Sequence, residues 1–349
     1  MLGVAVCLLS AALAAPELHG QEREFLTHFY YVNDPASWRS LQKNSSQIDL
    51  LSPNWFAVDA EGVVHSTLDP AVVKWARDCQ IALLPLVVNQ GFDPAAARTL
   101  LAGKRKQKKI IEQLLAFAAQ HHFQGFELDF EQVSARDRKR LADFVGRLSK
   151  ELRRRGLKLG IAVHAPLMKA ESSAAWVATG EARAFDYRKL ARQADYLALM
   201  SYDLHIRLRD PGPIASLPWM EACVRRLLAE VPPEKLLLGM PFYYRRWNGQ
   251  AVSEGSYLQA QVLAEQWQSR VEPDPVHREK TFAFQNGEGR NQVWFNDAGD
   301  LGERLNLARK YGLRGFSAWR LGQEDPAFWN AILAPLTTSR RRSASTPSP

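Results

Sequence analysis

The segment QGFELDFEQV at residues 124–133 has the pattern of a β-strand with one acidic face. Its apolar residues alternate with Glu127, Asp129 and Glu131. The period of two places the three carboxyl groups on one face, roughly 6.5–7 Å apart from one to the next. Because like charges this close raise each other's pKa, we expect at least one carboxyl group to keep its proton. Carboxyl groups whose pKa values are pushed apart supply a general acid and a charged stabiliser at one pH.

A helix is expected directly after this strand. Ser134-Ala135-Arg136-Asp137 is a capping signal, and Gly156 marks the helix end. The apolar face between them consists of Leu141, Phe144, Val145, Leu148 and Leu152. A strand that runs into a helix is a β/α unit, and its acidic end points to the rim where α/β barrels keep their active sites. The alternative is a solvated acidic edge strand, which the following helix disfavours.

The alternation of strand and helix continues about eight times along the chain. The expected strands are 25–32, 48–51, 81–88, 124–133, 157–163, 196–200, 236–240 and 313–318. This order predicts the α/β class and a (β/α)8 TIM barrel within residues 16–336. Residues from about 244 to 295 carry interspersed Gly, Asn and Pro, which predicts a small insertion after the seventh strand.

The two ends of the chain differ in composition from the predicted barrel. Residues 1–15 contain an apolar run followed by small residues before Pro16, which predicts a signal peptide that is too short to span a membrane. We therefore expect a secreted or periplasmic protein without stable membrane insertion. Residues 337–349 are rich in Ser, Thr, Arg and Pro and are expected to be disordered.

The 349-residue chain has a formal net charge of +8, which suits an anionic partner such as a cell-wall polymer. We expect no nucleic-acid partner, since no nucleic-acid-binding motif is present. We also expect a monomer without a metal or cofactor, because no metal-ligand spacing or Gly-rich phosphate loop occurs. The basic run at residues 104–109 is either a solvated helix face or a patch that binds an anionic wall.

The segment QGFELDFE resembles the DGxDxDxE signature of glycoside hydrolase family 18. In that family the last Glu is the catalytic acid, which places Glu131 in this role, and Asp129 matches the inner Asp. Gln124 stands where the first Asp is usual, and Glu127 stands where the outer Asp is usual, as a supporting residue. The variant looks closer to the branch of spore-cortex N-acetylglucosaminidases than to classical chitinases.

Three further segments at expected strand ends resemble the same family, so the resemblance covers nearly all of residues 25–335. LALMSYDLH matches its MxYD motif through Met200, Tyr202 and Asp203. LLLGMPFYYRRW is similar to its GxPFYG segment and contains Tyr243. GFSAWRLGQED supplies Trp319, which matches the tryptophan that floors the sugar pocket. Four motifs in the family order, on the fourth, sixth, seventh and eighth expected strands, are far more specific than any one of them.

The resemblance implies substrate-assisted hydrolysis, in which the 2-acetamido oxygen of the substrate is the nucleophile. Glu131 would protonate the leaving oxygen, and Asp129 would bind the acetamido N–H. Tyr202 would donate to the acetamido carbonyl oxygen, while Trp319 would stack beneath the sugar. The residues expected to line the sugar groove are Asn89, Trp55, Tyr243, His205, Met200 and Asp203, whereas His28 and His164 are expected to be structural.

These expectations converge on an exported retaining glycosidase that cleaves β-1,4-linked N-acetylglucosamine polymers, with peptidoglycan favoured by the positive charge. A chitinase or chitooligosaccharide hydrolase is the first alternative. The second alternative is a non-catalytic, chitinase-like sugar-binding protein. Proteins of this last kind typically lose the catalytic acid, whereas Glu131 is present.

Overall fold

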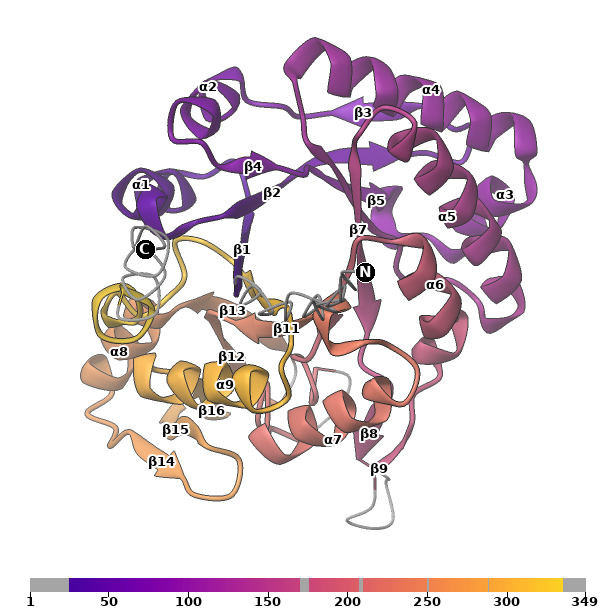
Figure 1. Ribbon diagram of the computed structural model, residues 1–349. Coiled ribbons are helices and arrows are strands. Elements are labelled where there is room, and N and C mark those ends of the chain that lie inside the picture. The colour runs from indigo at the N-terminus through magenta and orange to yellow at the C-terminus, as the bar shows by residue number, and fades with distance from the viewer. Residues whose placement is uncertain (1–24, 170–175, 207–209, 250, 288, 335–349) are drawn as a thin grey trace, which may run out of the picture.

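The computed structural model describes residues 25–169, 176–206, 210–249, 251–287 and 289–334 (Figure 1). The expected signal peptide at 1–15 and the expected disordered tail at 337–349 lie outside the described residues. Within the described ranges, no helix is long and apolar enough to cross a membrane.

Eight parallel strands form a closed barrel, seen along its axis in Figure 1. These strands are β1 (Leu26–Tyr31), β2 (Leu50–Val58), β5 (Leu86–Asn89), β6 (Gly125–Asp129), β7 (Lys158–His164), β10 (Tyr196–Met200), β11 (Leu236–Pro241) and β17 (Gly315–Trp319). They pair in this order, and β17 returns to pair with β1, which closes the barrel. The structure therefore confirms the predicted (β/α)8 fold.

Helices surround the barrel on the outside (Figure 1). They are α1 (Pro35–Asn44), α2 (Pro70–Asp78), α3 (Pro94–Ala102), α4 (Lys104–His121), α5 (Arg138–Arg153), α6 (Tyr187–Gln193), α7 (Leu217–Leu228) and α9 (Ala298–Lys310). The first three begin with an Asp-Pro pair, in which Asp34, Asp69 and Asp93 each accept a backbone N–H of the first turn. Asp suits the N-cap and Pro suits the first helical position, so the sequence itself sets these helix starts.

The strand boundaries differ from the sequence prediction at three places. The acidic strand, expected at 124–133, ends at Asp129. The expected strand 81–88 is divided into β4 (Ala82–Leu83) and β5, because Pro85 between them has no N–H for the ladder. The second strand does not end at Leu51 but continues to Val58, where β3 (Val64–Ser66) pairs with it in antiparallel fashion. A hairpin of β8 (Leu167–Lys169) and β9 (Trp176–Ala178), which the sequence analysis did not foresee, follows β7.

Between β11 and α9 the chain forms a second, antiparallel sheet. Its strands are β12 (Tyr243–Trp247), β13 (Val252–Ser256), β14 (Glu272–Asp274), β15 (Glu279–Asn286) and β16 (Gly289–Phe295), and α8 (Tyr257–Gln266) packs against it. A buried ion pair ties this sheet to α9, because Arg304 Nη2 lies 3.4 Å from Glu279 Oε1. Glu279 also accepts the backbone N–H groups of Ile214 and Ala215, so its charge is satisfied away from water.

Strand β6 shows how the alternating pattern of the sequence is used. Phe126 packs against the rings of Phe56 and Phe123. Beyond the strand end, Phe130 stacks on Phe144 of α5, with ring centroids 5.9 Å apart. The apolar positions therefore anchor the strand to its surroundings, and the acidic positions between them are left to face the barrel interior.

Candidate active site

The three carboxyl groups of the acidic strand lie at three depths in the barrel. Glu127 is completely buried and Asp129 is 6% exposed. Glu131, two residues beyond the end of β6, has 26% of its side chain exposed. Burial thus increases steadily from the rim inward, so the three groups occupy different electrostatic environments.

Glu127 is surrounded by hydroxyl donors. Tyr30 donates to its Oε1 at 2.5 Å, Tyr196 to its Oε2 at 2.6 Å, and Ser52 to its Oε2 at 3.3 Å. Burial raises the pKa of Glu127 to about 7, although these three donors favour the charged form. Gly160 makes room for this arrangement, because a Cβ there would lie 2.3 Å from the ring of Tyr196.

His28 extends the group of side chains around Glu127. Its Nε2 lies 2.8 Å from the hydroxyl of Ser52 and 3.4 Å from Glu127 Oε2. Burial lowers the pKa of His28 to about 3, so the ring is neutral and adds no positive charge beside the carboxyl group.

Asp129 is a buried carboxyl group with one oxygen available to a ligand. Burial raises its pKa well above the usual range, and the negative charges of Glu131 and Glu127 raise it further. The protonated form of Asp129 is therefore favoured relative to an exposed aspartate. Its Oδ1 has no hydrogen-bond partner within the part of the chain that the structure describes. A neutral carboxyl group with an unused oxygen can accept from a ligand amide in the adjacent cavity.

Asn89 fixes the backbone of Glu131. Its Nδ2 donates to the carbonyl oxygen of Glu131 at 3.1 Å, and its Oδ1 accepts the N–H of Glu131 at 2.9 Å. Asn89 is buried, both ends of its amide are used, and it is not among the residues that line either cavity. It positions Glu131 instead.

A cavity of about 280 Å³ lies above Asp129 at the carboxyl-terminal ends of the strands. It is lined by Tyr30, Asn54, Phe92, Asp129, Glu131, Ala162, Met200, Tyr202, Asp203, Tyr243, Arg245, Glu254 and Trp319. Trp319 packs against Tyr30, and Tyr202 meets Tyr243 edge to face at 6.2 Å. The structure therefore brings Trp319, Tyr202 and Tyr243 together with the acidic residues in one cavity.

Asp203 is held by a residue that the sequence analysis missed. Arg245 of β12 donates to both of its oxygens, from Nε at 2.8 Å and from Nη2 at 2.7 Å. This two-point pairing fixes the orientation of the carboxylate. The inserted sheet thus contributes to the wall of the cavity, and Arg245 could have been suspected because it follows the Tyr243 motif by two residues.

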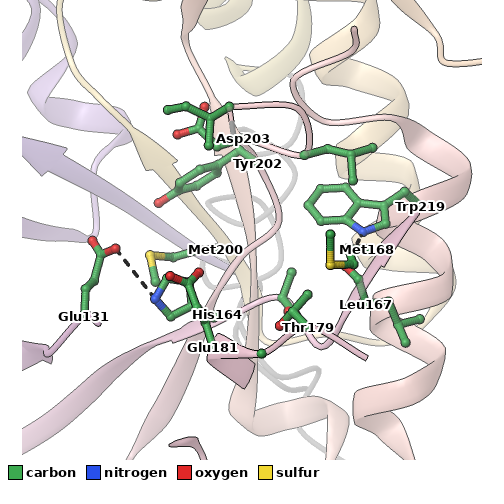
Figure 2. Close-up of a pocket in the computed structure, with 14 residues that line it drawn as sticks. Glu131, His164, Leu167, Met168, Thr179, Glu181, Met200, Tyr202, Asp203 and Trp219 are labelled. Atoms are coloured by element: carbon green, nitrogen blue, oxygen red, sulfur yellow. Dashed lines mark hydrogen bonds and ion pairs between the residues drawn. The ribbon is translucent and has the colours of Figure 1, made fainter. Parts of the chain in front are cut away.

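A second cavity of about 500 Å³ adjoins the first (Figure 2). It is lined by Glu131, His164, Ala165, Leu167, Met168, Thr179, Gly180, Glu181, Met200, Tyr202, Asp203, Leu204, Ile206 and Trp219. The two cavities share Glu131, Met200, Tyr202 and Asp203. Figure 2 shows the hydroxyl of Tyr202 pointing toward Glu131. Glu131 therefore lies where the two cavities meet. This is the position expected for a residue that cleaves a bond between a group bound in one cavity and a group bound in the other.

Two other residues expected in the groove lie elsewhere. Trp55 is buried in the core and donates its Nε1–H to Asn33 at 2.9 Å, and it lines neither cavity. Since β2 continues past Leu51, its neighbour Asn54 is the residue that lines the cavity. His205 packs against Gly212, where a Cβ would meet its ring at 2.3 Å, and it lines neither cavity.

The fold and the site together define a barrel glycosidase. An acid at the junction of two cavities, with a second carboxyl group buried beside it, is an arrangement suited to hydrolysis of a glycosidic bond. The model of the glycosyl hydrolases family 18 matches residues 89–324, which is most of the chain. The chain belongs to this family and is a glycosidase.

Similar proteins include bacterial glycosylases and chitinases. The uncharacterized glycosylase YvbX of Bacillus subtilis (strain 168) is 24% identical over 320 residues, which cover 88% of this chain and 90% of YvbX. The cortical fragment-lytic enzyme of the same organism is 26% identical over 69% of this chain, and the match spans 56% of that enzyme. A chitinase from Chromobacterium violaceum ATCC 12472 has a TM-score of 0.80 and 26% identity, covering 93% of this chain and all of that structure.

Proposed function

We propose that the protein is an exported retaining glycosidase that hydrolyses β-1,4-linked N-acetylglucosamine polymers by substrate-assisted catalysis, with peptidoglycan as the substrate. The observation that carries the proposal is the position of Glu131, at the junction of the two cavities beside Asp129 and Tyr202. A sugar in the smaller cavity and the leaving part of the chain in the larger one would bring the bond between them to Glu131.

The proposed roles follow from this placement. Glu131 protonates the glycosidic oxygen as the bond breaks, which leaves Glu131 as a carboxylate. The acetamido oxygen of the same sugar attacks the anomeric carbon, so the protein needs no nucleophile of its own. Asp129 binds the acetamido nitrogen, and the Tyr202 hydroxyl donates to the acetamido oxygen. Trp319 supports the sugar from below. A water then opens the ring intermediate and gives its proton back to Glu131.

Positive charge near the catalytic rim supports an anionic polymer. Helix N-termini lie on the active-site side of a (β/α)8 barrel, and α4 begins with the exposed cations Lys104 and Arg105 and no acid in its first turn. Cations at a helix N-terminus oppose its dipole and cost stability. The peptide stems of peptidoglycan carry carboxylates that would offset this cost, whereas chitin is uncharged.

The test compares release of reducing ends from purified peptidoglycan and from chitin oligosaccharides, with wild type and Glu131→Gln. We expect cleavage of peptidoglycan that is lost in Glu131→Gln and kept in Glu112→Gln, which alters an exposed acid on α4. Cleavage of chitin oligosaccharides alone would identify a chitinase. That second candidate is supported by the likeness to the chitinase of Chromobacterium violaceum.

A charge test addresses the polymer separately. Lys104→Gln with Arg105→Gln should raise KM for peptidoglycan and leave hydrolysis of chitin oligosaccharides unchanged. The matched control is Lys150→Gln with Arg192→Gln, which removes two cations from the last turns of α5 and α6. Equal effects of the two double variants would remove the argument for an anionic substrate.

A further inference from the structure

Three ionisable side chains form a row along the wall of the larger cavity. His164 Nε2 lies 3.6 Å from Glu131 Oε2, and His164 Nδ1 lies 3.4 Å from Glu181 Oε2. Figure 2 shows the imidazole between the two carboxyl groups. The four sequence motifs contain Glu131 but neither His164 nor Glu181, so these motifs leave the two partners without a role.

The imidazole is held in place by its surroundings. His164 is the last residue of β7 and pairs in register with Met200 of β10. Its carbonyl oxygen accepts the hydroxyl of Tyr187 at 2.9 Å, and the ring of Phe185 packs against the imidazole with centroids 5.6 Å apart. A side chain at a strand end with these contacts can act as a fixed support for a neighbour.

We propose that His164, charged and held by Glu181, is a positioning residue that orients Glu131 and stabilises the negative charge that Glu131 gains on giving up its proton. The inference rests on the proposed function, because it assumes that Glu131 protonates a glycosidic oxygen. It assigns a role to a histidine for which the sequence analysis expected only a structural one.

The chemistry follows from the two contacts. A carboxylate is a hydrogen-bond acceptor only, so Glu181 fixes the hydrogen of Nδ1 and offsets the charge of the ring. The N–H at Nε2 then faces Oε2 of Glu131 and leaves the acidic proton to the other oxygen. When that proton passes to the leaving oxygen, the electron pair of the C–O bond stays with that oxygen, and the charge formed on Glu131 faces the imidazolium. His164 itself gains and loses no proton.

The separation of 3.6 Å between His164 Nε2 and Glu131 Oε2 is longer than a hydrogen bond, and we expect it to shorten when substrate binds. Contacts of catalytic groups are often long in unliganded enzymes and shorten when substrate binds. A small rotation of the exposed end of Glu131 would close the gap, because the backbone of Glu131 is already fixed by Asn89.

The experiment compares two leaving groups. A β-1,4-linked N-acetylglucosamine oligosaccharide leaves as a sugar alkoxide and needs a proton, whereas a 4-nitrophenyl glycoside of the same sugars leaves without one. His164→Ala should lower kcat for the oligosaccharide by about 10–100-fold and change kcat for the aryl glycoside much less. His164→Gln should recover part of the loss, because its amide N–H reaches toward Glu131. Glu181→Gln should give a smaller loss with the same dependence on the leaving group.

The control is His65→Ala, which removes a histidine that contacts a carboxylate outside both cavities, with Nε2 2.8 Å from Asp59 Oδ2. It should leave kcat for both substrates unchanged. Equal losses on both substrates in His164→Ala, or no loss in any of the three variants, would overturn the inference. If His164→Ala fails to fold, His164→Gln and Glu181→Gln decide the question by the same comparison. Wild type that cleaves neither substrate and releases no reducing ends from peptidoglycan would refute the proposed function itself.

Discussion

Glu127 and Glu131 are the same residue type and lie four positions apart, one within β6 and one just beyond its end, yet their surroundings are opposite. Glu127 is completely buried and accepts three hydroxyl donors. Glu131 is partly exposed and is shared by two cavities. The alternating strand delivers both carboxyl groups to the barrel interior, and depth then separates them. We infer that the deep group serves the structure and the rim group serves the chemistry.

The largest effect is expected for Glu131→Gln, which tests whether the rim carboxyl group serves catalysis rather than stability. We expect kcat to fall by at least about 10²–10⁴-fold, since general acid catalysis contributes this much. The free energy of unfolding should change by less than about 0.5 kcal/mol, because the side chain is partly exposed. Turnover and urea unfolding of the same preparation check both statements. A variant that kept wild-type turnover would move the acid elsewhere in the cavity.

The pH dependence of the free energy of unfolding tests the role of the deep carboxyl group, Glu127. Burial raises the pKa of Glu127 from 4.5 to about 7, so between these values the native protein keeps a proton that the unfolded chain releases. Stability therefore falls as pH rises through this window, by up to about 3 kcal/mol from this group. Glu127→Gln cannot titrate, so its stability should depend less on pH.

Urea unfolding of wild type and Glu127→Gln at pH 4.5 and 7.5 measures this difference. Glu279 is a second buried carboxyl group whose pKa burial raises to about 7, and it contributes with the same sign. Because Glu279 is present in both proteins, the difference between their pH slopes reports Glu127 together with its electrostatic effect on Asp129. Identical slopes would show that Glu127 is not buried with a raised pKa.

The sequence predicts best those site residues that lie at the carboxyl-terminal ends of the barrel strands. The period of two on β6 placed three carboxyl groups in the interior, and Met200, Tyr202, Tyr243 and Trp319 at other strand ends meet them. At Trp55 the structure differs from the expectation by one position, because β2 is longer than expected and its Asn54 lines the cavity while Trp55 lies in the core. Strand length depends on pairing with neighbours, which a local pattern does not contain.

Contacts between segments far apart in the chain could not be predicted from the sequence. Arg245 reaches Asp203 only because the inserted sheet folds over the barrel rim. The hydroxyl donors to Glu127 come from Tyr30 and Tyr196, which are 97 and 69 residues away along the chain. No spacing rule relates positions so far apart, so these partners become visible only when the barrel closes.

Loss of the hydrogen bonds from Asn89 to the backbone of Glu131 is expected to have a smaller effect on turnover. Asn89→Ala removes both hydrogen bonds to the backbone of Glu131, and a slight misplacement of the acid should lower kcat about 10-fold. Asn89→Asp keeps an acceptor for the N–H of Glu131 and should lose less. Steady-state kinetics on one oligosaccharide substrate ranks the two variants. A loss confined to KM would instead show that Asn89 contacts the substrate.

Ser52→Ala gives the smallest effect and tests whether the deep carboxyl group is purely structural. It removes the longest of the three hydroxyl contacts to Glu127, at 3.3 Å, and should cost about 1 kcal/mol of unfolding free energy. The cost should shrink when Glu127 is already Gln, because the two side chains are in contact and their effects are coupled. Turnover should stay near that of wild type throughout this double-mutant cycle. A large fall in kcat with Ser52→Ala would mean that the effect of Glu127 on the pKa of Asp129 extends to catalysis, and the division between a structural and a chemical end of the segment would then fail.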